Sequence, residues 1–128
     1  MIYLDTSVLL AQLLAEDRAP AAGFWEQTLV SSRLIEYETW NRLHALGLAG
    51  SHGEDARGLL QRVALLELTP LVLARALQPF PAGVRTLDGL HLASLCFLEE
   101  QGQRVALATY DERLGNAAAT LGFAVTAP

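Results

Sequence analysis

The sequence predicts an α/β domain built on a parallel β-sheet that is covered by helices on both faces. Short, continuous apolar runs alternate with longer helical segments along the chain, a pattern typical of strands buried on both sides. The chain has 128 residues, 52% apolar and 18% charged, which is enough apolar material for a packed core and too little charge for disorder. Because it contains no repeat, linker or low-complexity stretch, we expect residues 1–128 to form a single domain.

The first half of the chain is expected to alternate strands and helices. The apolar run Ile2–Leu4 predicts a buried strand, and the run Val8–Ala15 predicts a helix with Asp5 or Thr6 at its cap. Proline suits the first turn of a helix, so a second helix is expected over Pro20–Thr28. The elements expected next are a strand at Leu29–Ser32, a helix at Arg33–Leu48 closed by Gly47 or Gly50, a loop at Ser51–Gly53 and a helix at Glu54–Arg62.

The second half continues the same alternation. The run Val63–Leu68 fits a strand or a continued helix, and Thr69-Pro70 favours a strand because it stops the run and begins another helix. The segment Gln78–Gly83 is a break. The elements expected after it are a helix capped by Thr86 that ends near Glu100, a strand at Val105–Tyr110, a helix at Asp111–Leu121 and a strand at Phe123–Thr126.

Composition excludes several classes of function. The net charge of −5 excludes a whole-molecule basic surface for nucleic acid, although a local basic patch remains compatible with it. All nine basic residues are arginines, so lysine-dependent chemistry such as a P-loop or a Schiff base is excluded. The single cysteine excludes an internal disulfide and a cysteine-rich zinc site. The apolar stretch near the start is too short for a signal peptide or a membrane span, so we expect a cytoplasmic protein.

Acidic residues recur at the ends of the expected strands. Asp5 and Asp111 each follow a buried strand, at the sheet edge where ligands bind in open α/β folds. Asp88 lies in the first turn of a helix, and each of these acids alone would be explained by capping or by the helix dipole. Glu36 and Glu38 are two residues apart on a helix, so they cannot both face one site, and the apolar pattern does not decide between them.

Convergence of these acids would call for a cation. Two unit charges about 5 Å apart repel by roughly 3 kcal/mol at an effective dielectric constant near 20. Four carboxylates therefore cannot all stay ionised together without a cation or a strongly raised pKa. Oxygen ligands of this kind suit Mg²⁺ or Mn²⁺, which would activate water for phosphodiester hydrolysis.

Four segments of the sequence together resemble the PIN-domain ribonucleases, and most of all the VapC-type toxins of toxin–antitoxin pairs. The segments are Ile2–Ser7, Ser31–Glu38, Arg85–Ser94 and Thr109–Leu114, and they span almost the whole chain in the order of that family. The resemblance implies a three-layer α/β/α sandwich with a central parallel sheet. It also implies an Mg²⁺- or Mn²⁺-dependent endoribonuclease that cuts transfer or ribosomal RNA, is held by a small antitoxin and forms a homodimer.

The resemblance also assigns roles to individual residues. It gives the metal and catalytic roles to four acids, with Glu36 as a neighbour only: Asp5, Glu38, Asp88 and Asp111. Thr6, Ser7 and Thr109 would support these carboxylates or the metal's waters. A further family acid corresponds to Asn116 or is lost, which leaves the number of ions open.

Residues near the acids have competing interpretations. Arg33, Arg42 and Arg85 are candidates for binding RNA phosphate, and a solvated surface is the alternative. His91 lies three residues after Asp88 and is expected to pack or hydrogen-bond rather than to bind a metal. Two other kinds of function are considered. One is a small phosphohydrolase, disfavoured by Ser7, or a phospho-accepting signalling domain, disfavoured by the missing lysine. The other is a PIN-like binding domain in which catalysis is dispensable.

Overall fold

Five parallel strands form one sheet in the computed structural model, which describes residues 1–81 and 83–128. They are β1 (Ile2–Leu4), β2 (Leu29–Ser32), β3 (Val63–Leu66), β4 (Ala106–Ala108) and β5 (Ala124–Thr126). Their order across the sheet is β3-β2-β1-β4-β5, and every neighbouring pair is parallel. The chain therefore builds outward on one side of β1 and then crosses to the other. The strand order switches between β1 and β4, where open α/β sheets form their ligand-binding crevice.

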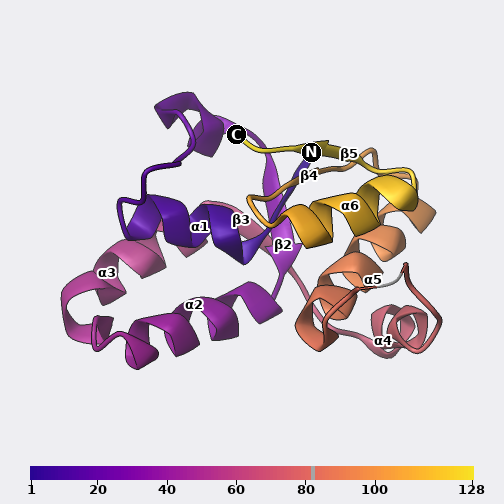
Figure 1. Ribbon diagram of the computed structural model, residues 1–128, viewed down its shortest axis with the longest axis horizontal. Coiled ribbons are helices and arrows are strands. Elements are labelled where there is room, and N and C mark those ends of the chain that lie inside the picture. Colours follow the sequence, from indigo (N-terminus) through magenta and orange to yellow (C-terminus); the bar gives the residue numbers. More distant parts are fainter. Residues whose placement is uncertain (82) are drawn as a thin grey trace.

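Helices cover both faces of the sheet, as Figure 1 shows. One face carries α1 (Thr6–Leu13), α2 (Leu34–Ala45) and α3 (Ala49–Leu60), whose apolar side chains share a core with Leu4, Leu29 and Val63. The other face carries α5 (Thr86–Glu100) and α6 (Glu112–Thr120), packed on Tyr3, Val30 and Leu107. A shorter helix, α4 (Pro70–Ala76), packs against α5. The predicted α/β class and its three-layer form are confirmed.

Short strand-to-helix connections bring polar residues to one edge of the sheet. Asp5 follows β1 directly and caps α1, with its side chain accepting a hydrogen bond from the Ser7 amide. Asp111 follows β4 and caps α6 in the same way, accepting from the amides of Arg113 and Leu114. Because parallel strands all end at the same edge, both caps lie beside the switch in strand order.

Two predicted elements are wrong, and packing explains both. A full helix over Pro20–Thr28 does not form; a short 3-10 turn, Ala22–Glu26, stands there instead, because it buries the neighbouring rings of Phe24 and Trp25 in the core. The predicted loop Ser51–Gly53 lies inside α3. Gly53 serves close packing there, since a Cβ atom on it would lie 2.9 Å from a ring carbon of Trp40.

The remaining differences concern element ends. The residue that caps α5 is Arg85, whose side chain makes no capping bond, and Thr86 is the first helical residue, so the predicted Thr86 cap is wrong. Gly47 follows the end of α2 with a φ of 70°, the left-handed conformation expected of a helix-terminating glycine. The predicted break Gln78–Gly83 includes residue 82, which lies outside the described residues. Among the helices of the described chain, none has the length and apolar character needed to span a bilayer.

Candidate functional site

Four acidic residues from distant parts of the sequence line one cavity of about 590 Å³, hereafter the acid cavity. Asp5 and Asp111 come from the ends of β1 and β4, Glu38 from α2 and Asp88 from the first turn of α5. Thr6 and Ser7 also line it. Glu36, by contrast, is not part of this lining and pairs with Arg33. The fold therefore brings together the acids that the sequence separates, and of the two glutamates it turns Glu38 toward them.

The carboxylate of Asp5 is held firmly through one of its two oxygens. Oδ2 accepts hydrogen bonds from the Ser7 hydroxyl at 2.6 Å and from the Thr109 hydroxyl at 2.8 Å. The side chain is 5% exposed, so these bonds replace much of its hydration. Within the described residues, Oδ1 has no donor. Asp5 is thus oriented by two hydroxyl groups while one oxygen remains available to a ligand.

Glu38 and Asp111 repeat this one-sided arrangement. Oε1 of Glu38 accepts from the Thr6 hydroxyl at 2.9 Å and contacts Nε2 of His91 at 2.5 Å. Oδ1 of Asp111 accepts the two helix-capping amides described above. Neither Oε2 of Glu38 nor Oδ2 of Asp111 has a donor among the described residues. Three of the four acids therefore present one anchored and one available oxygen.

Asp88 is the acid whose charge is least compensated. Its carboxylate has no hydrogen-bond donor within the described part of the chain. Burial, followed by the charges of Asp111 and Asp5, raises the pKa of Asp88 from its usual 3.8 to about 6. The neighbouring charges show that the acids act on one another electrostatically, as expected for carboxylates that share a cavity.

The donor set of the acid cavity fits a hydrated divalent cation. Carboxylate oxygens are the ligands that Mg²⁺ and Mn²⁺ prefer, and the four acids here contribute oxygens without a donor from the described part of the chain. Over residues 1–81 and 83–128, however, no three His, Cys, Asp or Glu side chains are close enough to form a ready-made metal-binding group. Mg²⁺ commonly binds through one or two carboxylates and keeps several waters, so a fully enclosing cluster is not required.

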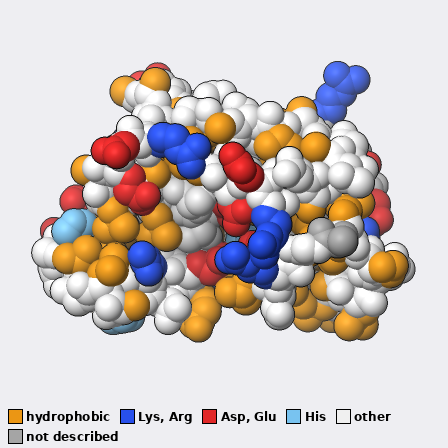
Figure 2. Space-filling model, in the orientation of Figure 1, with side chains coloured by type: hydrophobic (Ala, Val, Ile, Leu, Met, Phe, Trp, Pro, Cys, Tyr) orange, Lys and Arg blue, Asp and Glu red, His pale blue; other side chains and the backbone are white. Residues whose placement is uncertain are grey.

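Arginines lie beside the acids on the same face. Arg42 and Arg85 line the acid cavity. Figure 2 shows carboxylate side chains in a central hollow of this face, with arginine side chains on either side of it. Arg33 differs, because its guanidinium pairs with Glu36 and Glu67, both at 2.5 Å, and it does not line the cavity. The net charge of −5 thus coexists with local positive charge next to the acids.

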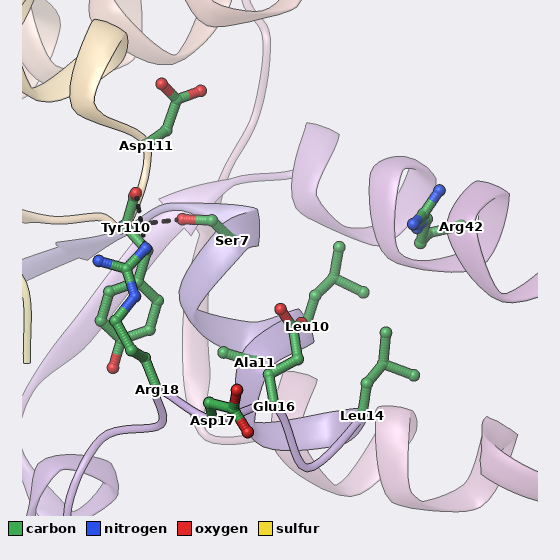
Figure 3. A pocket seen from close by; sticks show the side chains of 10 residues that line it. All are labelled: Ser7, Leu10, Ala11, Leu14, Glu16, Asp17, Arg18, Arg42, Tyr110 and Asp111. Carbon is green, nitrogen blue, oxygen red and sulfur yellow. Dashed lines mark hydrogen bonds between the residues drawn. The ribbon is translucent and has the colours of Figure 1, made fainter.

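A second cavity, of about 770 Å³, opens beside the first and shares Ser7, Leu10, Arg42 and Asp111 with it. In Figure 3, Leu10 and Leu14 line one side, and Arg42 lies across from them on α2. Arg18 donates a hydrogen bond to the carbonyl of Tyr110 and lies over its ring at 4.8 Å. The two cavities therefore form one continuous groove, which is lined by both apolar and charged side chains.

Some residues near the acids were not predicted from the sequence. Tyr3, which contacts His91, looks like an ordinary apolar residue of a buried strand. Arg18 lies in a segment without periodicity, so nothing in the sequence connects it to Tyr110. Asn116 lines a third cavity, next to Asp111, and not the acid cavity. His91 is fully buried and hydrogen-bonded on both ring nitrogens, in agreement with the expected structural role.

The structure is an α/β/α sandwich with acidic residues beside the switch in strand order. Comparison with known sequences identifies the family of proteins to which it belongs. Residues 2–119 match the PIN domain family, and the chain belongs to that family. It is 36% identical over 130 residues to ribonuclease VapC46 of Mycobacterium tuberculosis, covering 99% of this chain and 97% of the relative. It is 33% identical to ribonuclease VapC35 and 31% identical to ribonuclease VapC47 of the same species, in each case over 100% of this chain and 97% of the relative. The resemblance to VapC-type PIN proteins is confirmed.

Proposed function

We propose that this protein is an Mg²⁺- or Mn²⁺-dependent endoribonuclease and the toxin of a toxin–antitoxin pair. The observation that carries the proposal is the convergence of Asp5, Glu38, Asp88 and Asp111 on one cavity, with carboxylate oxygens that have no donor among the residues the structure describes. The names of the VapC relatives, all ribonucleases, support RNA as the substrate. RNA substrates of this kind would be met in the cytoplasm.

In this proposal the four acids bind the metal ion, and three hydroxyl side chains hold the acids in place. Asp5 and Asp88 would be the principal ligands, and Glu38 and Asp111 would contribute directly or through water. When bound, a divalent ion supplies an acidified water and positive charge for the phosphodiester. Ser7 and Thr109 hold Asp5 in place through the hydroxyl bonds to Oδ2, and Thr6 does the same for Glu38. These hydrogen bonds hold the carboxylates of Asp5 and Glu38 in place without a bound ion.

Arginines would supply the remaining positive charge, because the chain contains no lysine. Arg42 and Arg85 line the acid cavity and are suited to bidentate contacts with phosphate oxygens. We assign them to the RNA backbone on either side of the bond that is cut. Arg33 is a weaker candidate, because Glu36 and Glu67 already occupy its guanidinium.

Two protein partners complete the proposal. VapC-type relatives suggest a small antitoxin that covers the site. We also propose a homodimer formed through α4 and Leu77, the residue that caps its end: Leu71 and Leu77 are 71% and 89% exposed and Leu73 is 41% exposed. Exposed leucines in this number on and next to one short helix favour burial against another protein surface.

One observation favours a second function, a PIN-like domain that only binds a partner. Such a domain has no need of a metal, and the described residues contain no ready-made group of three ligands. The two hypotheses differ in whether the protein needs a metal ion. The ribonuclease proposed here requires Mn²⁺ or Mg²⁺ for activity, whereas a binding domain requires neither ion.

The test is cleavage of structured RNA by the purified protein. We expect activity with Mg²⁺ that is lost with EDTA and with Glu38→Gln. Glu36→Gln is the matched control, because Glu36 lies on the same helix, two residues away and outside the acid cavity. Cleavage that persists in EDTA, or that falls equally in both glutamate variants, would contradict the proposal.

A further inference from the structure

A buried chain of hydrogen bonds connects the interior of the sheet with Glu38. His91 on α5 is fully buried, with Nε2 at 2.5 Å from Oε1 of Glu38 and Nδ1 at 2.7 Å from the Tyr3 hydroxyl oxygen. Tyr3 is also fully buried, and its oxygen accepts a hydrogen bond from the Ser32 amide at 3.1 Å. His91 does not line the acid cavity, and among the residues that do, its hydrogen-bond partner in the described part of the chain is Glu38.

The partners determine the direction of these bonds. An ionised carboxylate only accepts, so Nε2 of His91 carries a hydrogen and donates it to Glu38. Nδ1 of His91 accepts a hydrogen bond from the Tyr3 hydroxyl when the ring is neutral and donates one to the hydroxyl oxygen when the ring is protonated, so the Nε2 donor to Glu38 is present in both forms. The Ser32 amide in turn donates to Tyr3. Every polar atom along the chain has a partner, which is the condition for burying a tyrosine and a histidine without a large cost.

This chain limits the freedom of an otherwise flexible side chain. Thr6 and His91 both bond to Oε1 of Glu38, from α1 and α5 respectively. Two donors on one oxygen, supplied by two different helices, fix the carboxylate and leave Oε2 as the oxygen available to a cation. Thr6 directly follows Asp5, so the hydrogen bond from Thr6 holds Glu38 at the same edge of the sheet as Asp5.

We infer that His91 is a positioning residue, which holds the Glu38 carboxylate so that Oε2 is presented to the divalent ion of the acid cavity. The inference rests on the proposed function. Residues that orient metal ligands without touching the metal typically change metal affinity about 10- to 100-fold when they are replaced. Tyr3 acts one step further away, by keeping the ring of His91 in the orientation that donates to Glu38.

A pair of substitutions separates positioning from packing. In His91→Gln the amide nitrogen reaches the position of Nε2 and keeps a donor for Glu38. In His91→Asn the amide nitrogen reaches the position of Nδ1 and keeps only the contact with Tyr3. Both variants remove the buried ring, and asparagine leaves the larger void, so the melting temperature of each variant measures what its packing loses. His44→Asn, on the exposed surface of α2, is the control for loss of a histidine elsewhere.

The measurement is calorimetric titration with Mn²⁺, together with the melting temperature of each variant. We expect His91→Asn to weaken Mn²⁺ binding about 10- to 100-fold. We expect His91→Gln to retain most of the affinity at a similar melting temperature, and His44→Asn to match the wild type. Equal affinities in wild type and His91→Asn would overturn the inference, as would equal losses in both His91 variants that follow their loss of stability.

The wild-type protein provides a second measurement if the variants do not fold. We expect the imidazole nitrogen signals of His91 in long-range ¹H–¹⁵N spectra to shift when Mg²⁺ is added, because Glu38 connects the ring to the ion. Unchanged signals at saturating Mg²⁺ would overturn the inference and leave the proposed function intact. If the wild-type protein binds neither Mn²⁺ nor Mg²⁺, the proposed function fails, and this inference fails with it.

Discussion

The uncompensated carboxylate of Asp88 leads to a prediction that opposes the usual effect of a mutation. Asp88→Asn should make the metal-free protein more stable above pH 7. Burial, together with Asp111 and Asp5, raises the pKa of Asp88 from 3.8 to about 6. A shift of about two units corresponds to about 3 kcal/mol. Because the side chain is partly exposed and solvent screens its charge, we expect about 1 kcal/mol.

The sign follows from proton binding. The folded carboxyl of Asp88 keeps its proton up to a pH of about 6, whereas in the unfolded chain it loses the proton near 3.8. Between these values the folded state binds more protons, so the wild type loses stability as the pH rises through this interval. Asparagine does not ionise. The advantage of Asp88→Asn should therefore be small near pH 4 and complete above pH 7.

Thermal unfolding in EDTA between pH 4.5 and 8 measures this difference. About 1 kcal/mol corresponds to an increase of about 4 °C in the melting temperature for a domain of this size. Asp55→Asn, on the exposed surface of α3, is the control and should show no such increase. If Asp88→Asn is less stable than the wild type above pH 7, or if the difference between the two does not change with pH, the charge of Asp88 does not destabilise the folded protein.

Three further predictions concern the ligands, the substrate and the dimer. Asp111→Asn should not lower the melting temperature, since asparagine caps a helix as well as aspartate does and its neutral side chain does not repel Asp88, while Mn²⁺ affinity measured by calorimetry falls; a large loss of stability would contradict this. Arg85→Ala should weaken RNA binding and reduce its salt dependence in a filter-binding assay, whereas Arg33→Ala should change it less; equal effects would remove the distinction. Leu77→Glu should convert a dimer to a monomer in analytical ultracentrifugation, and an unchanged mass would exclude α4 from the interface.

The fold was predictable because strands and helices differ in the length of their apolar runs. Each of the five strands lies within a predicted run. The central strands β1 and β2 are largely buried and leave a continuous apolar signal, whereas the edge strand β5 is exposed. The predicted loop at Ser51–Gly53 was wrong for a physical reason. Glycine is enriched both in turns and where two elements approach closely, and only the contact of Gly53 with Trp40 distinguishes the two cases.

The candidate site was predictable in part. Acids directly after strands must lie at one sheet edge, so Asp5 and Asp111 could be brought together by topology alone. The choice between Glu36 and Glu38 depends on the rotation of α2 about its axis, which the apolar pattern left open and the family resemblance supplied. The bonds of Glu38 to Thr6 and His91 depend on the packing of three helices, and no local pattern encodes them.

Anomalous diffraction from crystals soaked in Mn²⁺, measured at the manganese absorption edge, shows whether the four acids bind a divalent ion. We expect an anomalous peak in the acid cavity, coordinated by Asp5 and Asp88 directly or through water, and lost in Asp5→Asn. A cavity without a peak at saturating Mn²⁺, or a peak elsewhere that leaves the four acids uncoordinated, would contradict it.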